Sequence, residues 1–195
     1  MTRPATAALG LRVKSGWATA VLVVGPARTP RVVDRRVIEL SDPAVPSSRQ
    51  PYHAVMEASR RDAPNVERRL RQLVQQVTRR SVAELLRGYR RAGHHVRAVG
   101  LVVGSTIDPA RIANDHIRAH ALEGQLFRTA LATAAEALRL ACTVVVEREA
   151  FATASGRLKR PAAGLKRAVG ELGRALGGPW RAEEKTAALA AWMLL

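Results

Sequence analysis

The sequence of 195 residues contains little cysteine, lysine or aromatic side chain. Its one cysteine, Cys142, excludes an intrachain disulfide and is typical of a reducing compartment, so we predict a cytoplasmic protein. The apolar neighbours of Cys142 favour a small buried side chain over a reactive thiol. The three Trp, two Tyr and two Phe are too few for a platform on which single-stranded bases stack.

Long hydrophobic runs are also missing. No stretch of about 18 uncharged apolar residues occurs, so we predict no membrane span and no membrane partner. Residues 1–11 are too short an apolar stretch, and too soon followed by charge, for a signal peptide. The 47% of hydrophobic residues are nevertheless enough for a sizeable core.

Acidic residues are outnumbered two to one, by 32 Lys and Arg to 16 Asp and Glu, which gives a net charge of +16. Such an excess indicates an anionic partner, most often nucleic acid. A GC-rich genome, which favours arginine codons, would also produce such an excess, and charged helix faces are usually only solvated. The residues that we predict to contact phosphates are Arg68, Arg69, Arg79, Arg80, Arg157, Lys159 and Arg160.

Apolar periodicity predicts an α/β domain. Three runs joined by tight links predict an antiparallel meander, and the residues 41–51, rich in proline and serine, predict a loop. A helical stripe over 66–89 and a second helix over 114–140 alternate with two continuous apolar strands. The five predicted strands are 7–14, 17–24, 32–40, 97–103 and 143–147.

The remainder of the chain is predicted to be helical, over 151–158, 161–176 and 182–195. The expected element order is therefore β-β-β-α-β-α-β-α. We divide the chain into an α/β core, residues 1–150, and a helical C-terminal segment, residues 151–195, that packs on the same domain.

The most informative cluster is the trio His116, His120 and Glu123. At about 100° per residue these side chains share a narrow arc in the middle of an apolar helix face, which predicts that they point inward. Two imidazoles and a carboxylate at this spacing are able to bind zinc or another transition metal, or to act as a general acid–base site. The alternative is a polar network at a helix N-terminus that Asn114 or Asp115 caps.

Three short motifs resemble RuvC-type Holliday junction resolvases, members of the ribonuclease H-like superfamily. Residues 9–18 (LGLRVKSGWA) are similar to the first hairpin of that family. Glu147, at the end of the fifth predicted strand, and residues 184–190 (EKTAALA) resemble its later acidic positions. The resemblance implies a mixed five-stranded sheet flanked by helices. It also implies a nuclease ancestry in which clustered carboxylates hold two divalent metals about 4 Å apart.

The chain departs from that pattern at the metal ligands. Arg12 stands at the position of the first aspartate, Ala187 at that of the last, and residues 99–104 contain no acid. Only Glu147 and Glu184 match, so the resemblance implies that the nuclease site is lost. The first hairpin can also be compared with sugar-kinase and actin-type ATPases, but these need two such domains and a glycine-rich phosphate loop.

Three functional hypotheses follow, and whether the chain is an enzyme stays open. The leading one is a nucleic-acid-associated protein, catalytically degenerate as a nuclease. The second is a metal-dependent phosphodiester or phosphate hydrolase with a rebuilt site. The third is a protein-binding scaffold with a basic face, and a homodimer is a further arrangement to be tested. The candidate catalytic residues are His116, His120, Glu123, Glu147 and Glu184, and the candidate metal ligands are His116, His120 and Glu123.

Overall fold

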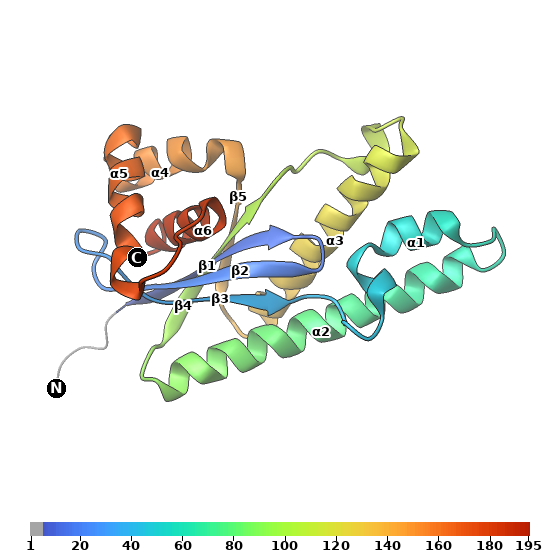
Figure 1. Cartoon of the computed structure of the whole chain (residues 1–195), viewed down its shortest axis with the longest axis horizontal. Coiled ribbons are helices and arrows are strands. Elements are labelled where there is room, and N and C mark those ends of the chain that lie inside the picture. Colours follow the sequence, from blue (N-terminus) through green and yellow to red (C-terminus); the bar gives the residue numbers. More distant parts are fainter. Residues whose placement is uncertain (1–5) are drawn as a thin grey trace.

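The computed structural model describes residues 6–195 and contains a mixed five-stranded sheet in the order β3-β2-β1-β4-β5 (Figure 1). β1 pairs with β2, and β2 with β3, in antiparallel register, whereas β1, β4 and β5 run parallel. The prediction of three antiparallel strands followed by a parallel unit is therefore confirmed. The strands are β1 (Ala7–Lys14), β2 (Trp17–Val24), β3 (Arg31–Glu39), β4 (Val96–Val103) and β5 (Ala141–Val146).

The first hairpin closes over two residues, because Lys14 pairs with Trp17. Gly16 adopts a φ of 85°, a left-handed conformation that suits glycine and allows this tight turn. The turn fixes the register of β1, so that Leu9, Leu11 and Val13 face one side of the sheet while Ala8, Gly10 and Arg12 face the other.

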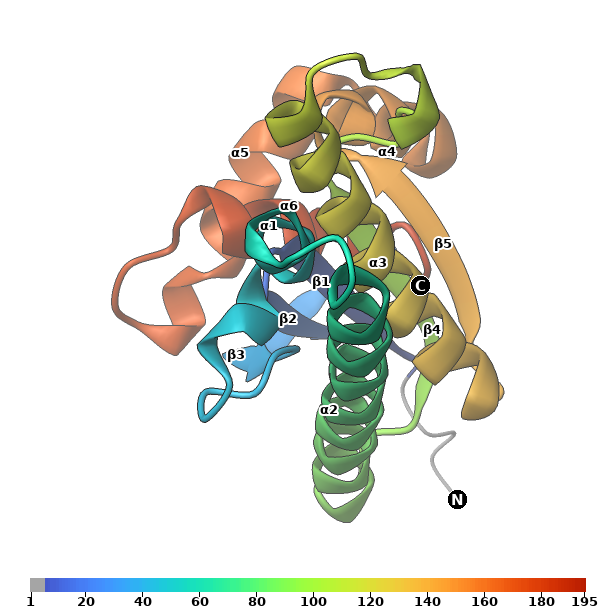
Figure 2. The same ribbon diagram turned by 90° about the vertical axis from the view of Figure 1, so that its right-hand side faces the viewer.

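Two helices, α2 (Ala63–Arg91) and α3 (Asp115–Ala137), cover the first side of the sheet, as Figure 2 shows, and α1 (Pro51–Glu57) packs on both of them. The main core lies between α2, α3 and the strands and includes Leu11, Val74 and Phe127. The predicted apolar stripe of α2 is confirmed, since its buried residues are Leu70, Val74, Val77, Thr78, Val82, Leu85 and Tyr89.

The other side is covered by α6 (Ala182–Trp192), on which α4 (Ala150–Leu158) and α5 (Ala162–Leu172) pack. α6 approaches the sheet closely because its contact residues are mostly alanines. A Cβ on Gly10 would lie 1.8 Å from the carbonyl oxygen of Ala187. Small residues on both elements thus set the distance between helix and strand.

Several predicted boundaries are wrong. The loop predicted over 41–51 contains a 3-10 turn, Pro46–Arg49, and is followed by α1, which was not predicted. β5 ends at Val146, so that Glu147 opens a 3-10 turn instead of ending the strand. α5 stops at Leu172, short of the predicted residue 176. Among the described residues, no helix is long and apolar enough to cross a membrane.

Candidate functional site

The carboxyl ends of β1, β4 and β5 meet at one edge of the sheet, where open α/β sheets usually bind ligands. Arg12 of β1 lies at this edge and is only 4% exposed. Its Nε donates to Glu147 Oε1 at 2.9 Å, and its Nη2 donates to Glu147 Oε2. Its Nη1 donates to the carbonyl oxygen of Val13 at 2.6 Å. All three nitrogens of the guanidinium therefore donate hydrogen bonds, and two of them form a bidentate pair with the carboxylate of Glu147.

This pair changes the electrostatics of the edge. A guanidinium stays charged at any physiological pH, so Arg12 compensates the charge of Glu147 permanently. Both carboxylate oxygens of Glu147 are engaged. A divalent cation at Glu147 would compete with Arg12 for the carboxylate oxygens and would lie beside its positive charge. Glu147 thus forms an ion pair directly after the end of β5. Arg118, on α3, pairs with Asp115.

Glu184 is not part of this edge pair. Its carboxylate accepts a hydrogen bond from the backbone N–H of Arg181 at 2.8 Å and caps the first turn of α6. The carboxylates of Glu147 and Glu184, the two acids that match the family pattern, thus have separate structural roles. They form no group of potential metal ligands within residues 6–195.

The histidines of α3 meet a third one that the sequence analysis missed. His53, from α1, joins His116 and His120, and one potential ligand atom from each lies within 4.8 Å of the others. His53 Nε2 is 3.2 Å from His116 Nδ1. The ring centroid of His53 lies 4.8 Å from that of His116 and 4.4 Å from that of His120, and the centroids of His116 and His120 are 4.7 Å apart. We call these three residues the histidine cluster.

Glu123 lies beneath the cluster and is fully buried, with 0% exposure. Its Oε1 is 2.7 Å from His53 Nδ1 and also accepts the backbone N–H of His53 at 3.4 Å. Its Oε2 has no hydrogen-bond partner among the described residues and lies 3.5 Å from His120 Nδ1. A buried carboxylate oxygen without a donor is costly.

The prediction that the whole trio points inward is wrong for two of its members. Glu123 is buried, but His116 and His120 are exposed. The first turns of α3 extend past the sheet (Figure 1), where α1 and the 3-10 turn Pro109–Arg111 pack against α3. The predicted cap is present, because the Asn114 side chain accepts the backbone N–H of Ile117 at 3.0 Å.

His53 could not be assigned to the cluster from the sequence, because it lies 63 residues before His116 in a segment without clear periodicity. The available signal was Pro51, which suits the first turn of a helix and begins α1. That signal predicts a helix but not that its first turn, with His53, meets α3.

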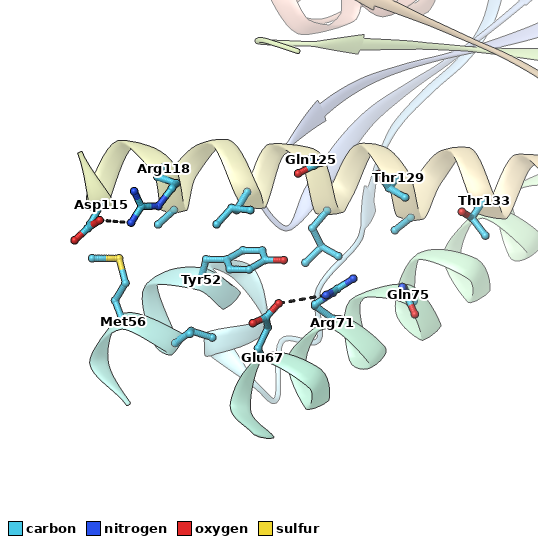
Figure 3. Close-up of a pocket in the computed structure, with 15 residues that line it drawn as sticks. Tyr52, Met56, Glu67, Arg71, Gln75, Asp115, Arg118, Gln125, Thr129 and Thr133 are labelled. Atoms are coloured by element: carbon cyan, nitrogen blue, oxygen red, sulfur yellow. Dashed lines mark hydrogen bonds and ion pairs between the residues drawn. The ribbon is translucent and has the colours of Figure 1, made fainter. Parts of the chain in front are cut away.

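Two hollows flank the cluster. A groove of about 820 Å³ runs between α1, α2 and α3; Figure 3 shows Tyr52 and Met56 on one wall and Arg118 on the other. Burial raises the pKa of Tyr52 there. A cleft of about 430 Å³ opens at the carboxyl edge and is lined by both Arg12 and His120. The histidine cluster therefore adjoins the edge at which Arg12 and Glu147 pair.

The predicted phosphate contacts do not form one surface. Arg68, Arg69, Arg79 and Arg80 are exposed on α2, on one side of the sheet. The other three predicted residues lie in the last turn of α4 or directly after it, and α4 packs on the opposite side of the sheet (Figure 1). A rigid straight duplex would not contact both sets at once. These opposite-side residues are Arg157, Lys159 and Arg160, all exposed.

A mixed sheet of this order, with helices on both sides, has the ribonuclease H-like fold that the motifs implied. Two solved structures of RuvC from Thermus thermophilus share it. One is in complex with a Holliday junction substrate and has a TM-score of 0.51, with 13% identity over 96% of this chain and 91% of that one. The other has a TM-score of 0.50, with 13% identity over 96% of this chain and 92% of that one.

A member of the Ppx/GppA family from Aquifex aeolicus is more distant, with a TM-score of 0.39 and 11% identity over 80% of this chain and 40% of that one. No protein-family model matches the chain, and no curated protein matches it. At these identities the likeness shows the fold alone, and the function has to be argued from the residues.

Proposed function

We propose that this protein binds nucleic acid through the exposed arginines of α2 and that it does not carry out two-metal nuclease chemistry. The observation that carries the first part is a line of arginines along one face of α2. We call Arg69, Arg80, Arg87 and Arg91 the arginine stripe.

The stripe follows from helix geometry. At about 100° per residue its four members fall within about 40° of one another, roughly opposite the buried stripe that contains Leu70 and Val74. At about 1.5 Å per residue they extend over about 33 Å. All four are exposed, and none has an ionic or hydrogen-bonding partner in the described part of the chain.

Duplex DNA presents about one phosphate charge per 1.7 Å of its axis, so a line of free guanidinium groups of this length can neutralise several phosphates. Arginine suits this role because its planar donor fork matches phosphate oxygens. The structure of the Thermus thermophilus RuvC with a Holliday junction is a precedent for nucleic-acid binding on this fold. The small number of aromatic side chains favours duplex or branched substrates over single strands.

The second part of the proposal rests on the Arg12–Glu147 pair. Two-metal catalysis needs carboxylates with free oxygens around the cations. At the carboxyl edge of the sheet a buried guanidinium pairs with both oxygens of Glu147, the acid there that matches the resolvase pattern. We therefore expect Mg²⁺ to cause no cleavage of bound nucleic acid.

The experiment is a fluorescence-anisotropy titration of labelled duplex DNA, branched DNA and duplex RNA at low salt. We expect the triple variant Arg69→Gln, Arg80→Gln and Arg87→Gln to bind at least 30-fold more weakly than the wild type. This expectation assumes roughly 0.7 kcal/mol or more for each lost phosphate contact, a value within the range of an ordinary net hydrogen bond and below that of a bond to a charged group.

The matched control removes the same three charges from the opposite side of the sheet, with Arg157→Gln, Lys159→Gln and Arg167→Gln, which are all exposed. Its affinity should fall by less than about fivefold. Equal losses in the two variants would show that overall charge and not the stripe governs binding. A stable protein complex that survives nuclease treatment, with no nucleic-acid binding, would favour the scaffold hypothesis.

The histidine cluster favours a second candidate function, metal-assisted hydrolysis of a phosphodiester or phosphate. The hypothesised catalytic site included Glu147 as well as the residues of α3, but Glu147 pairs with Arg12 and is separate from the histidine cluster. Hydrolysis would therefore depend on His116, His120 and Glu123 together with His53. Turnover of bis(p-nitrophenyl) phosphate with added Zn²⁺, lost in His120→Ala, would support it, whereas equal background rates in both proteins would eliminate it.

We further propose a cytoplasmic location, which the single half-buried Cys142 supports because it needs no oxidising environment. A homodimer stays a prediction. Size-exclusion chromatography with light scattering measures it directly, and a mass near 21.1 kDa would exclude it.

A further inference from the structure

We propose that the histidine cluster is a site for a divalent transition metal such as zinc, with His53, His116 and His120 as ligands and Glu123 as the buried partner that orients them. This site differs from the predicted one, because His53 replaces Glu123 in the ligand set. It does not depend on nucleic-acid binding.

The ligand chemistry selects the class of metal. Neutral imidazole nitrogens suit zinc, copper and nickel, whereas magnesium and calcium need oxygen ligands. Two of the ligands, His116 and His120, are one turn apart on one face of α3, a spacing that lets both rings reach one ion. The third comes from another helix, so the metal would tie α1 to α3.

The distances fit this class of site. With zinc–nitrogen bonds of about 2.0–2.1 Å in a tetrahedron, neighbouring ligand nitrogens are about 3.4 Å apart. His53 Nε2 and His116 Nδ1 are already 3.2 Å apart. The remaining separations, up to 4.8 Å, need only small ring rotations of an exposed histidine.

Glu123 is placed as the carboxylate behind metal-binding histidines usually is. A carboxylate that accepts the Nδ1–H of a histidine fixes the tautomer and leaves Nε2 for a metal. Glu123 Oε1 takes this role for His53 at 2.7 Å. Its unpartnered Oε2 faces His120 Nδ1 at 3.5 Å, and a small rotation of the His120 ring toward an ion would bring that N–H into hydrogen-bonding range.

The charge balance also favours a cation. Glu123 is fully buried, and within the described residues it has only imidazoles as side-chain partners. A divalent ion held by three neutral imidazoles would compensate its negative charge. The exposed rings of His116 and His120 provide an entry path, and three protein ligands leave a fourth position for water.

The test is zinc titration of the metal-free full-length protein against a chromophoric chelator, with atomic emission to count bound zinc. We expect one zinc per chain in the wild type. His116→Ala should weaken zinc binding at least 100-fold, and because this side chain is exposed its loss should leave the fold intact, as far-UV circular dichroism would show.

The remaining two histidines of the chain provide a matched control, since His94 and His95 lie between α2 and β4, away from the cluster. The double variant His94→Ala and His95→Ala should bind zinc as the wild type does. Glu123→Gln should keep one zinc per chain with 10- to 100-fold weaker affinity, the usual effect of losing an outer partner. Zinc binding well below one per chain in the wild type would overturn the proposal, as would unchanged binding in His116→Ala.

Discussion

Arg12 is the residue on which the interpretation of the carboxyl edge depends. It is buried, whereas its partner Glu147 has a side chain that is 38% exposed. Removal of one member of a buried ion pair leaves a charge or a carbonyl group without compensation. The exposure of Glu147 reduces that cost, because solvent screens the charge that remains.

We predict that Arg12→Ala lowers the free energy of unfolding by about 2 kcal/mol, less than for a fully buried pair. Urea unfolding followed by circular dichroism measures this. The control is Arg148→Ala, which removes a neighbouring pair with Glu149 whose side chains are 78% and 57% exposed, and which should cost less than about 0.5 kcal/mol. A similar loss of unfolding free energy in both variants would show that the Arg12–Glu147 pair stabilises the fold no more than an exposed ion pair does.

A second residue-scale prediction concerns Asp34 on β3. Burial pushes the pKa of Asp34 upward, but hydrogen bonds from Arg36 and Tyr89 outweigh it, so the pKa lies below its ordinary value of 3.8. A lowered pKa in the folded state contributes stability above the ordinary value, and this contribution is lost as the pH falls through the folded value. Asp34→Asn should therefore cost about 1 kcal/mol at pH 7 and progressively less toward pH 3. Urea unfolding at several pH values tests this, and a constant difference would contradict it.

At the scale of elements, the contact between α6 and β1 is the tightest that we describe. The Cβ of an alanine at position 10 would overlap the backbone of α6, which has no flexible side chain that could yield. We predict that Gly10→Ala lowers the free energy of unfolding by about 3 kcal/mol or more. Gly88→Ala, inside α2 with nothing within 4 Å, should instead stabilise the protein by about 0.5–1 kcal/mol. Chemical denaturation compares them, and a neutral Gly10→Ala would refute the close packing.

The elements also show what the sequence can predict. The strands and the helices α2 and α3 were predictable because long apolar patterns with a clear period decide them. α1 was not, since a helix of seven residues has too few turns to show a period. The pairing of Arg12 with Glu147 spans 135 residues, and the sequence showed only that Arg12 stands where the resembled family has an aspartate. His53 joins the cluster through tertiary packing alone, which no local pattern records.

At the scale of the whole molecule, the charge is distributed over two sides of one sheet. The C-terminal helices contribute buried residues of α6, such as Leu189 and Trp192, to the core. The division into a core of residues 1–150 and a C-terminal segment stays a prediction. The net charge of +16 provides long-range attraction for nucleic acid, while the arginine stripe provides a defined contact line.

The most direct test of nucleic-acid binding without two-metal chemistry is the affinity for a labelled DNA duplex, measured by anisotropy from 50 to 300 mM salt, with EDTA or with Mg²⁺. With four phosphates neutralised by the stripe, the logarithm of the association constant should fall against the logarithm of salt with a slope of about −3.6. Binding should persist with EDTA, and the duplex should stay intact with Mg²⁺. The absence of binding at 50 mM salt, or cleavage that requires Mg²⁺, would contradict the account.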